Sequence, residues 1–174
     1  MSPLRPTVAA VDTNVLVDFA KPREMVHDAI ALMRERIEGG VEFWVQATAL
    51  QELMDICDNH NVAESALAAK ALDNLRAWGF KPKEGTGVGR GIEECIADKI
   101  REKGLLPDDE RNDSFIVAEA ALADATILLT SDGHMLGMDM NQLKLLLRSH
   151  DVGTPIVVSP AKIVTDFFPK KRRA

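Results

Sequence analysis

Two aspartates stand at points where a folded chain can bring carboxylates together. Asp12 closes a short apolar, β-branched run, residues 7–12, that is typical of a buried parallel strand. Asp132 follows a second such run, residues 126–130. In an open parallel sheet, ligands bind beyond the carboxyl ends of the strands. We therefore expect the two aspartates to face one crevice.

Two further acids complete a possible metal site. Asp113 directly precedes the apolar segment 114–123, and Glu52 lies at the margin of the apolar face of the expected helix 47–58. If the four carboxylates converge in the fold, they repel one another, and a divalent cation removes that repulsion. Mg²⁺ and Mn²⁺ prefer oxygen ligands and keep waters that can become nucleophiles. The four acids therefore predict a metal site able to activate water against a phosphodiester.

Each acid also has a structural interpretation when it is taken alone. Asp113 is an acceptable N-cap for the helix that follows it. The pair Asp132-Gly133 is common in turns, and Glu52 could be a solvated helix residue. Asp12 is harder to explain in this way, because an aspartate at the end of an apolar strand needs a partner. The order and context of the four acids together favour the metal site.

Strands and helices alternate along the chain, which favours an α/β fold with three layers, α/β/α, around a central and mostly parallel sheet. A glycine-rich stretch, 81–91, indicates a flexible loop and matches neither a dinucleotide fingerprint nor a P-loop. Further strands are expected at 42–45 and 155–158, and further helices at 23–38, 62–78, 92–103 and 141–149.

Length and composition fit one domain over residues 5–168, followed by a basic tail at 169–174 that we expect to be disordered. The net charge of −6 argues against electrostatic binding of nucleic acid by the surface as a whole. Cys57 and Cys95 have no metal-binding spacing, and are either thiols in a reducing compartment, which we expect, or a single disulfide bridge. With neither a membrane span nor a signal peptide expected, the sequence predicts a cytoplasmic location.

The sequence resembles the PIN-domain family in three segments. These are VAAVDTNVLVD at 8–18, the glutamate-bearing ALQELMDI at 49–56, and NDSFIVAEAALADATILLTSD at 112–132. The resemblance implies a parallel sheet flanked by helices, an acidic pocket at its carboxyl edge, and metal-dependent ribonuclease activity with Mg²⁺ or Mn²⁺. The family's four acids fall on Asp12, Glu52, Asp113 and Asp132, its small polar residue on Asn14, and its hydroxyl on Thr130 or Ser131.

Under this interpretation, Asp12 and Asp113 are the best candidates for direct metal ligands. Glu52 and Asp132 would ligate, bind through water or orient the attacking water. Asn14 and the Thr130 or Ser131 hydroxyl would hydrogen-bond the ligand oxygens. Asp109, Glu110 and Asp139 lie nearby in the sequence, but the family pattern does not require them.

The resemblance also implies partners. RNA, single-stranded or structured, is the expected substrate. Many small PIN proteins resemble the toxin halves of bacterial toxin–antitoxin pairs, of the VapC type, so an antitoxin-like protein and a homodimer are expected as well. The extra length around residues 60–110 leaves an RNA-processing role open. The basic residues at 170–173 either touch phosphate or serve as a solvated tail.

Three other functions compete with this one. A haloacid-dehalogenase-like phosphatase needs a second aspartate where Asn14 stands. A receiver-like domain needs an acidic pair before its phospho-acceptor strand and a later lysine, and the segment 126–132 supplies neither. The main alternative is a PIN-like module that binds RNA or protein without cutting. Loss of RNA cleavage with EDTA and with Asp12→Asn separates the nuclease from that module.

Overall fold

The computed structural model describes residues 5–59 and 61–167, and within them the chain forms one five-stranded sheet. All neighbouring strands run parallel, in the order β3-β2-β1-β4-β5. The fold is therefore the parallel α/β architecture that the sequence predicts. The strands are β1 (Thr7–Val11), β2 (Val41–Val45), β3 (Phe80–Pro82), β4 (Ile127–Leu129) and β5 (Ile156–Val158).

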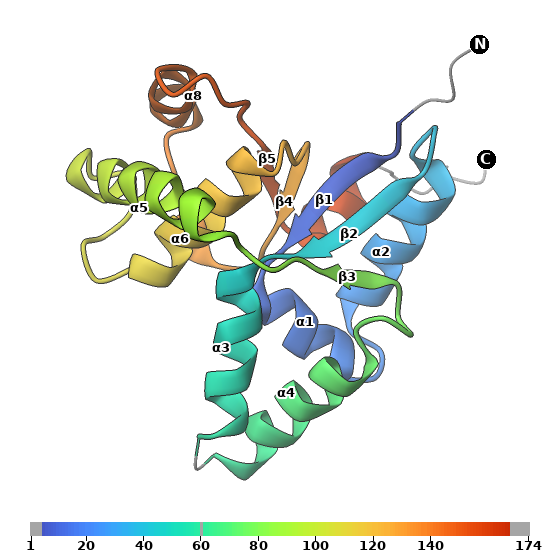
Figure 1. The fold of residues 1–174 in the computed structure, drawn as a ribbon. Helices are drawn as coiled ribbons and strands as arrows, with labels where there is room; N and C mark the ends of the chain where they lie inside the picture. Colours follow the sequence, from blue (N-terminus) through green and yellow to red (C-terminus); the bar gives the residue numbers. More distant parts are fainter. Residues whose placement is uncertain (1–4, 60, 168–174) are drawn as a thin grey trace.

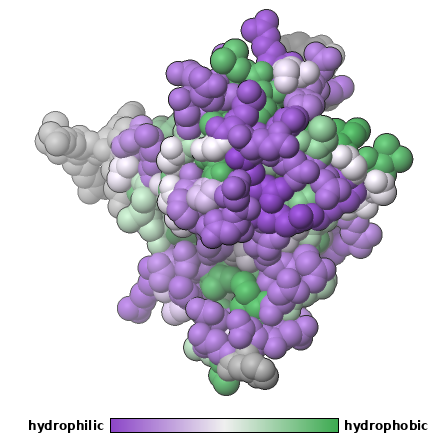
Figure 2. Space-filling model, turned by 90° about the vertical axis from the view of Figure 1, so that its left-hand side faces the viewer, coloured by the Kyte–Doolittle hydropathy of each residue, from purple (hydrophilic) through white to green (hydrophobic). Residues whose placement is uncertain are grey.

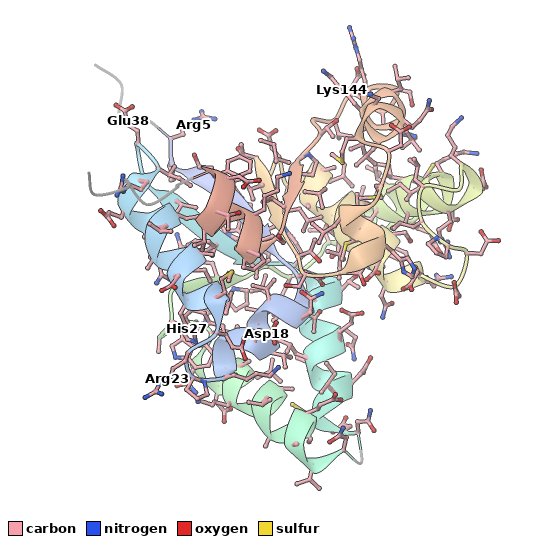
Figure 3. All side chains as sticks on the ribbon, turned by 180° about the vertical axis from the view of Figure 1, so that it is seen from behind. Arg5, Asp18, Arg23, His27, Glu38 and Lys144 are labelled. Carbon is pink, nitrogen blue, oxygen red and sulfur yellow. The ribbon has the colours of Figure 1, made fainter. Side chains whose placement is uncertain are left out.

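Helices cover both faces of this sheet (Figure 1). In that view α1, α2 and α4 lie on one side, and α5, α6 and α8 lie on the other. Figure 3 shows the molecule from behind, with Lys144 of α8 and Arg23, just before α2, at opposite ends. The helices are α1 (Thr13–Ala20), α2 (Met25–Arg36), α3 (Ala47–Cys57), α4 (Val62–Asn74), α5 (Gly87–Glu102), α6 (Arg111–Leu122), α7 (Gly133–Leu136), α8 (Met140–Arg148) and α9 (Pro160–Lys162), which continues into the π-helical turn η1 (Ile163–Phe167).

The strand order creates a switch point between β1 and β4. From β1 the chain adds β2 and β3 on one side of the sheet, and β4 and β5 then extend the other side. The loops after β1 and β4 consequently leave the same edge as neighbours, and the amide of Asp12 still donates to the carbonyl of Leu129 at 3.0 Å. A crevice at this edge is the expected ligand site of such a sheet.

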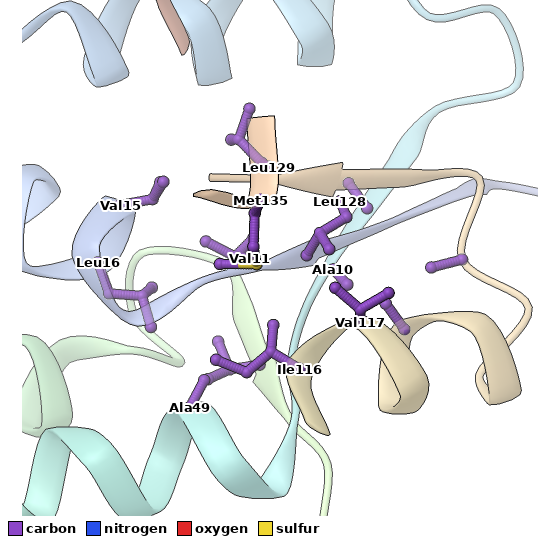
Figure 4. Close-up of a cluster of buried hydrophobic side chains, with 14 of the residues drawn as sticks. Ala10, Val11, Val15, Leu16, Ala49, Ile116, Val117, Leu128, Leu129 and Met135 are labelled. Carbon is purple, nitrogen blue, oxygen red and sulfur yellow. The ribbon is translucent and has the colours of Figure 1, made fainter. Parts of the chain in front are cut away.

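The core explains why the segment after Glu110 becomes a buried helix. Residues 114–121 of α6 are all buried, since α6 packs against the sheet on one side and against α5 and α3 on others. Figure 4 shows Ile116 and Val117 of α6 beside Ala10 of β1, with Ala49 of α3 close by. Burying one such large aliphatic side chain contributes about 1.5–3 kcal/mol.

Three local expectations were wrong. The segment 13–20 forms α1, which was not expected, because it continues the apolar run of β1 without a break. The glycine-rich stretch 81–91 is not one loop: it contains the end of β3 and the start of α5. Thr86 makes that start possible, since its side chain caps α5 by accepting from the amide of Gly89 at 3.1 Å.

The third difference concerns Asp113, which was expected just before its helix. The structure starts α6 at Arg111 with Glu110 as the N-cap residue, so Asp113 lies within the first turn. The basic tail expected at 169–174 lies outside the described residues. Across the part of the chain that is described, no helix is both long and apolar enough to cross a membrane.

Candidate functional site

Asp12 lies directly after β1, at the edge of the sheet where the neighbouring strands β1 and β4 both end. Asp12 is 2% exposed and is the N-cap residue of α1. Its Oδ1 accepts a hydrogen bond of 2.6 Å from the amide of Thr13. Its Oδ2 accepts from Asn14 Nδ2 at 2.9 Å and from Thr130 Oγ1 at 2.7 Å. The same aspartate therefore caps a helix and presents a buried carboxylate at the sheet edge.

The loop after β4 supports this carboxylate. Thr130 is fully buried, and its Oγ1 accepts from the amide of Asp132 at 3.0 Å while donating to Asp12. Asn14 joins the two loops, because its Oδ1 accepts from the amide of Ser131 at 3.1 Å. Asn14 and Thr130 thus lie where the sequence places them. Ser131 is exposed, and its contact with Asn14 is made by the backbone rather than by its hydroxyl.

Asp132 lies at the same edge but also has a structural task. It is the N-cap residue of α7, and its Oδ1 accepts from the amide of Met135 at 2.9 Å. Its negative charge is close enough to raise the pKa of both Asp12 and Asp113. Asp132 therefore caps a helix, as its structural interpretation expects, and also adds negative charge beside Asp12 and Asp113.

Glu52 reaches the crevice from α3. Its Oε2 accepts a short hydrogen bond from Thr13 Oγ1, and its Oε1 accepts from Asn112 Nδ2 at 3.0 Å. Thr13 adjoins Asp12 and Asn112 adjoins Asp113, so both donors tie Glu52 to neighbours of the other acids. Thr13 and Asn112 were not predicted from the sequence, although their positions beside two candidate acids were the available signal.

The electrostatics show that the four acids form one group, here called the acid cluster (Asp12, Glu52, Asp113 and Asp132). Burial raises the pKa of Asp12 to about 7, with the charges of Glu52 and Asp132 adding to the effect. The pKa of Asp113 rises to about 8, first through burial and then through Asp12, Asp132, Glu110 and Glu52. The sequence therefore identified acids that do lie within electrostatic reach of one another.

A cavity of about 530 Å³, here called the acidic cavity, opens beside this cluster. Asp12, Glu52 and Asp113 line it, whereas Asp132 does not. Further acids follow its wall, and among the described residues Lys21 is the one basic side chain there. The other members of the wall include the acids Asp18, Asp55 and Glu64 and the apolar side chains Val17, Ile56 and Leu67.

The chemistry of these donors fits a hard divalent cation, but their present arrangement does not yet enclose one. Carboxylate, amide and hydroxyl oxygens are the ligands that Mg²⁺ and Mn²⁺ prefer. Within residues 5–59 and 61–167, however, no three His, Cys, Asp or Glu side chains form a group that could hold a metal ion. Protein donors occupy both oxygens of Asp12 and both of Glu52. Each carboxylate oxygen has two lone pairs, so a cation would compete with these donors at Oδ2 of Asp12, which already accepts two hydrogen bonds.

A second polar network lies next to the acid cluster and was not foreseen. Glu119 of α6 is 2% exposed, and its carboxylate accepts from the amide of Thr48 at 3.2 Å and from Thr48 Oγ1 at 2.6 Å. Arg90 of α5 donates to Glu119 Oε1 at 3.2 Å. Glu119 therefore acts as the cap for the start of α3 and links three helices. A glutamate inside an otherwise apolar helical segment was the signal in the sequence.

Comparison with known proteins identifies the fold. No model of a known protein family matches the sequence, and no curated protein matches it. Among solved structures, a chain of VapBC2 from Rickettsia felis, bound to a DNA fragment from the promoter, aligns with a TM-score of 0.57 at 12% identity. That alignment covers 88% of this chain and 98% of the other.

Two further structures agree. A chain of FitAcB from Neisseria gonorrhoeae aligns with a TM-score of 0.54 at 17% identity, over 88% of this chain and 98% of that one. A chain of VapBC-1 from nontypeable Haemophilus influenzae aligns with a TM-score of 0.56 at 14% identity, over 90% and 100%. At these identities the similarity concerns the fold. It confirms the PIN-like architecture that the sequence resemblance predicts.

Proposed function

We propose that this protein is a divalent-metal-dependent endoribonuclease that hydrolyses RNA phosphodiesters at the acid cluster. The observation that carries the proposal is the convergence of four acids from separate segments at the switch point of a PIN-like sheet. The raised pKa values of Asp12 and Asp113 support it. Buried like charges are costly, and a bound cation is the usual way in which proteins offset them.

The side chains of the cluster take different roles in this proposal. Asp12 and Asp113 are the direct ligands of Mg²⁺ or Mn²⁺, and Glu52 and Asp132 either ligate or orient the attacking water. Thr130, by donating to Oδ2 of Asp12, fixes the direction in which that carboxylate faces. Bound there, a divalent cation would supply positive charge for the phosphate and lower the pKa of water.

The acidic cavity favours a partner protein as well as a substrate. Its lining combines the apolar side chains Val17, Ile56 and Leu67 with acidic ones. Such a surface fits an amphipathic segment that carries basic residues. Solved structures of similar fold include VapBC and FitAB complexes, several of them bound to DNA. We propose that an antitoxin-like protein covers this cavity and restrains cleavage, as expected of a VapC-like toxin.

A second candidate function is a PIN-like module that binds RNA or protein without cutting. The observation that favours it is the absence, among the described residues, of a preformed group of metal-binding side chains. In this alternative, the hydrogen bonds from Thr13 and Asn112 hold the carboxylate of Glu52 where it does not contact a metal. In the nuclease, Glu52 ligates the cation or, while keeping these donors, orients the attacking water.

A cleavage experiment separates the two candidates. Single-stranded RNA is incubated with the protein and Mg²⁺ or Mn²⁺, with and without EDTA. We expect cleavage by the wild type and loss of cleavage with EDTA or with Asp12→Asn. The matched control is Asp124→Asn, which changes an exposed aspartate ahead of β4, at the opposite edge of the sheet.

Metal binding is measured in parallel by calorimetric titration. Cleavage that survives both EDTA and Asp12→Asn would refute the metal mechanism. Binding of Mn²⁺ without cleavage of any RNA would favour the non-cutting module. Absence of both metal binding and cleavage would refute the nuclease proposal.

A further inference from the structure

A second cavity lies beside the acidic cavity and shares part of its wall. Its volume is about 400 Å³, and it lies between α3, the start of α5 and Asn112. Glu52, Asp55 and Asn112 line both cavities. The two spaces therefore meet at the hydrogen bond between Asn112 and Glu52. A strand of RNA that leaves the acid cluster in this direction would pass along the second cavity.

Arg90 is the one cation that lines this second cavity, among the residues that the structure describes. Its Nη1 donates to Glu119 Oε1 at 3.2 Å and to Thr48 Oγ1 at 3.3 Å. Its guanidinium carbon lies 3.9 Å from the centre of the Phe115 ring. Glu119 is 2% exposed and Arg90 is 50% exposed. One edge of the guanidinium is therefore anchored inside the protein, and the rest of the group faces the cavity.

An arginine held in this way is suited to bind phosphate. The guanidinium presents five donors in a planar fork that matches phosphate oxygens. Because Glu119 and Phe115 already fix the plane, little side-chain freedom is lost when a ligand binds. Glu93 also lies near, with Oε2 at 3.7 Å from Nη1. Burial raises the pKa of Glu93 and of Glu119, and the charge of Arg90 beside them acts in the opposite direction.

We propose that Arg90 binds a backbone phosphate of the RNA strand next to the phosphate at the acid cluster, and that Glu119 is the residue that positions it. This inference rests on the proposed nuclease function for the identity of its ligand. Figure 2 shows the side of the molecule on which α5 and α3 lie. Hydrophilic residues cover most of that face, and apolar residues show in its lower half and near its upper and right-hand edges.

The experiment measures RNA binding without cleavage. The Asp12→Asn protein in EDTA is titrated with a fluorescent single-stranded RNA at several NaCl concentrations. The slope of log K against log salt is negative, and each lost contact between a cationic side chain and a phosphate makes it less steep by about 0.7 for single strands. We expect Arg90→Ala to make the slope less steep by about this amount and to weaken binding. Arg76→Ala removes an exposed arginine of the segment after α4 and should change neither quantity.

Two conservative variants test whether orientation matters beyond charge. Arg90→Lys keeps the charge but loses the planar fork, so we expect weaker binding. Glu119→Gln removes one negative charge, and charge alone would therefore strengthen the binding of RNA. The amide keeps one acceptor oxygen but loses the charge and presents donors to Thr48 and Arg90, which are donors themselves. The weaker anchor for Arg90 predicts the opposite sign, a binding constant lowered several-fold. Circular dichroism confirms that each variant is folded at the temperature of the titration.

The outcomes separate this inference from the nuclease proposal. Weaker binding by Arg90→Ala, Arg90→Lys and Glu119→Gln, with Arg76→Ala unchanged, supports the phosphate contact even if no RNA is cleaved. Normal affinity and slope for Arg90→Ala overturn it, even if the wild type cleaves RNA. Tighter binding by Glu119→Gln overturns the positioning role of Glu119. A parent protein that binds no RNA at any salt concentration overturns the whole inference.

Discussion

Asp12→Asn should stabilise the metal-free protein at alkaline pH, although it removes a central residue of the proposed site. Burial raises the pKa of Asp12 from 3.8 to about 7. The folded state therefore binds a proton more tightly than the unfolded state. For such a group, stability is lost as pH rises from the unfolded pKa to the folded one. An asparagine carries no charge at any pH and does not incur this loss.

The magnitude follows from the two pKa values. The shift is about three units, and each unit corresponds to about 1.4 kcal/mol. At pH 8 the buried charge of Asp12 thus costs about 4 kcal/mol, and at pH 5 it costs about 1.5 kcal/mol. The amide that Asp12→Asn introduces also brings a donor near Asn14 Nδ2, where the carboxylate offered only acceptors. That mismatch is present at both pH values, so it cancels from the difference of about 2.5 kcal/mol between them.

Urea denaturation in EDTA, followed by circular dichroism at pH 5 and pH 8, measures this difference. The free energy of unfolding of Asp12→Asn, relative to wild type, should rise by about 2.5 kcal/mol between the two pH values. Asp124→Asn, at an exposed position, should show no such change. An effect of Asp12→Asn that is the same at both pH values would refute the argument that the charge of Asp12 is costly in the fold.

Three further predictions concern the same region. At pH 8, saturating Mg²⁺ or Mn²⁺ should raise the melting temperature of the wild type but not of Asp12→Asn. A cation at a hundredfold excess over its Kd stabilises the folded state by about 2.7 kcal/mol. Equal shifts of the melting temperature in both proteins would contradict binding at the acid cluster. Thr130→Val removes a donor to Asp12 and should weaken Mn²⁺ binding by about tenfold in calorimetry. Glu119→Ala removes the acceptor of the amide and hydroxyl of Thr48 and the buried partner of Arg90, and should cost about 2–4 kcal/mol in urea denaturation. A cost below about 0.5 kcal/mol would show that Glu119 does not stabilise the fold.

The sequence predicted the parts of the fold that depend on local pattern. The runs at 7–12 and 126–130 are apolar over the length of a strand, and both became strands buried at the centre of the sheet. Helix α1 was not predicted, because its apolar residues continue the preceding run without a glycine or proline to mark a boundary. Only the side chain of Asp12, which caps α1, separates the strand from the helix.

The sequence predicted a set of residues for the candidate site, but not how their side chains are arranged. Sequence order and strand ends were enough to indicate that Asp12 and Asp132 would share an edge. They could not reveal that Asp132 faces α7 as its cap, or that Thr13 and Asn112 bind Glu52, because these contacts depend on how side chains are placed in three dimensions. Long-range hydrogen bonds such as those to Glu52 leave no periodicity in a sequence.

The network of Glu119 explains how a chain can keep mutually repelling acids together. The charges of the acid cluster favour separation of α3, which carries Glu52, from α6, which carries Asp113. Glu119 opposes this separation, since it lies on α6 and its carboxylate holds the first turn of α3 through Thr48. The two acids are therefore kept near each other by a polar contact one turn away from Glu52. If that contact is the restraint, Glu119→Ala should weaken Mn²⁺ binding, whereas Leu146→Ala, a core change of similar cost on α8, should not.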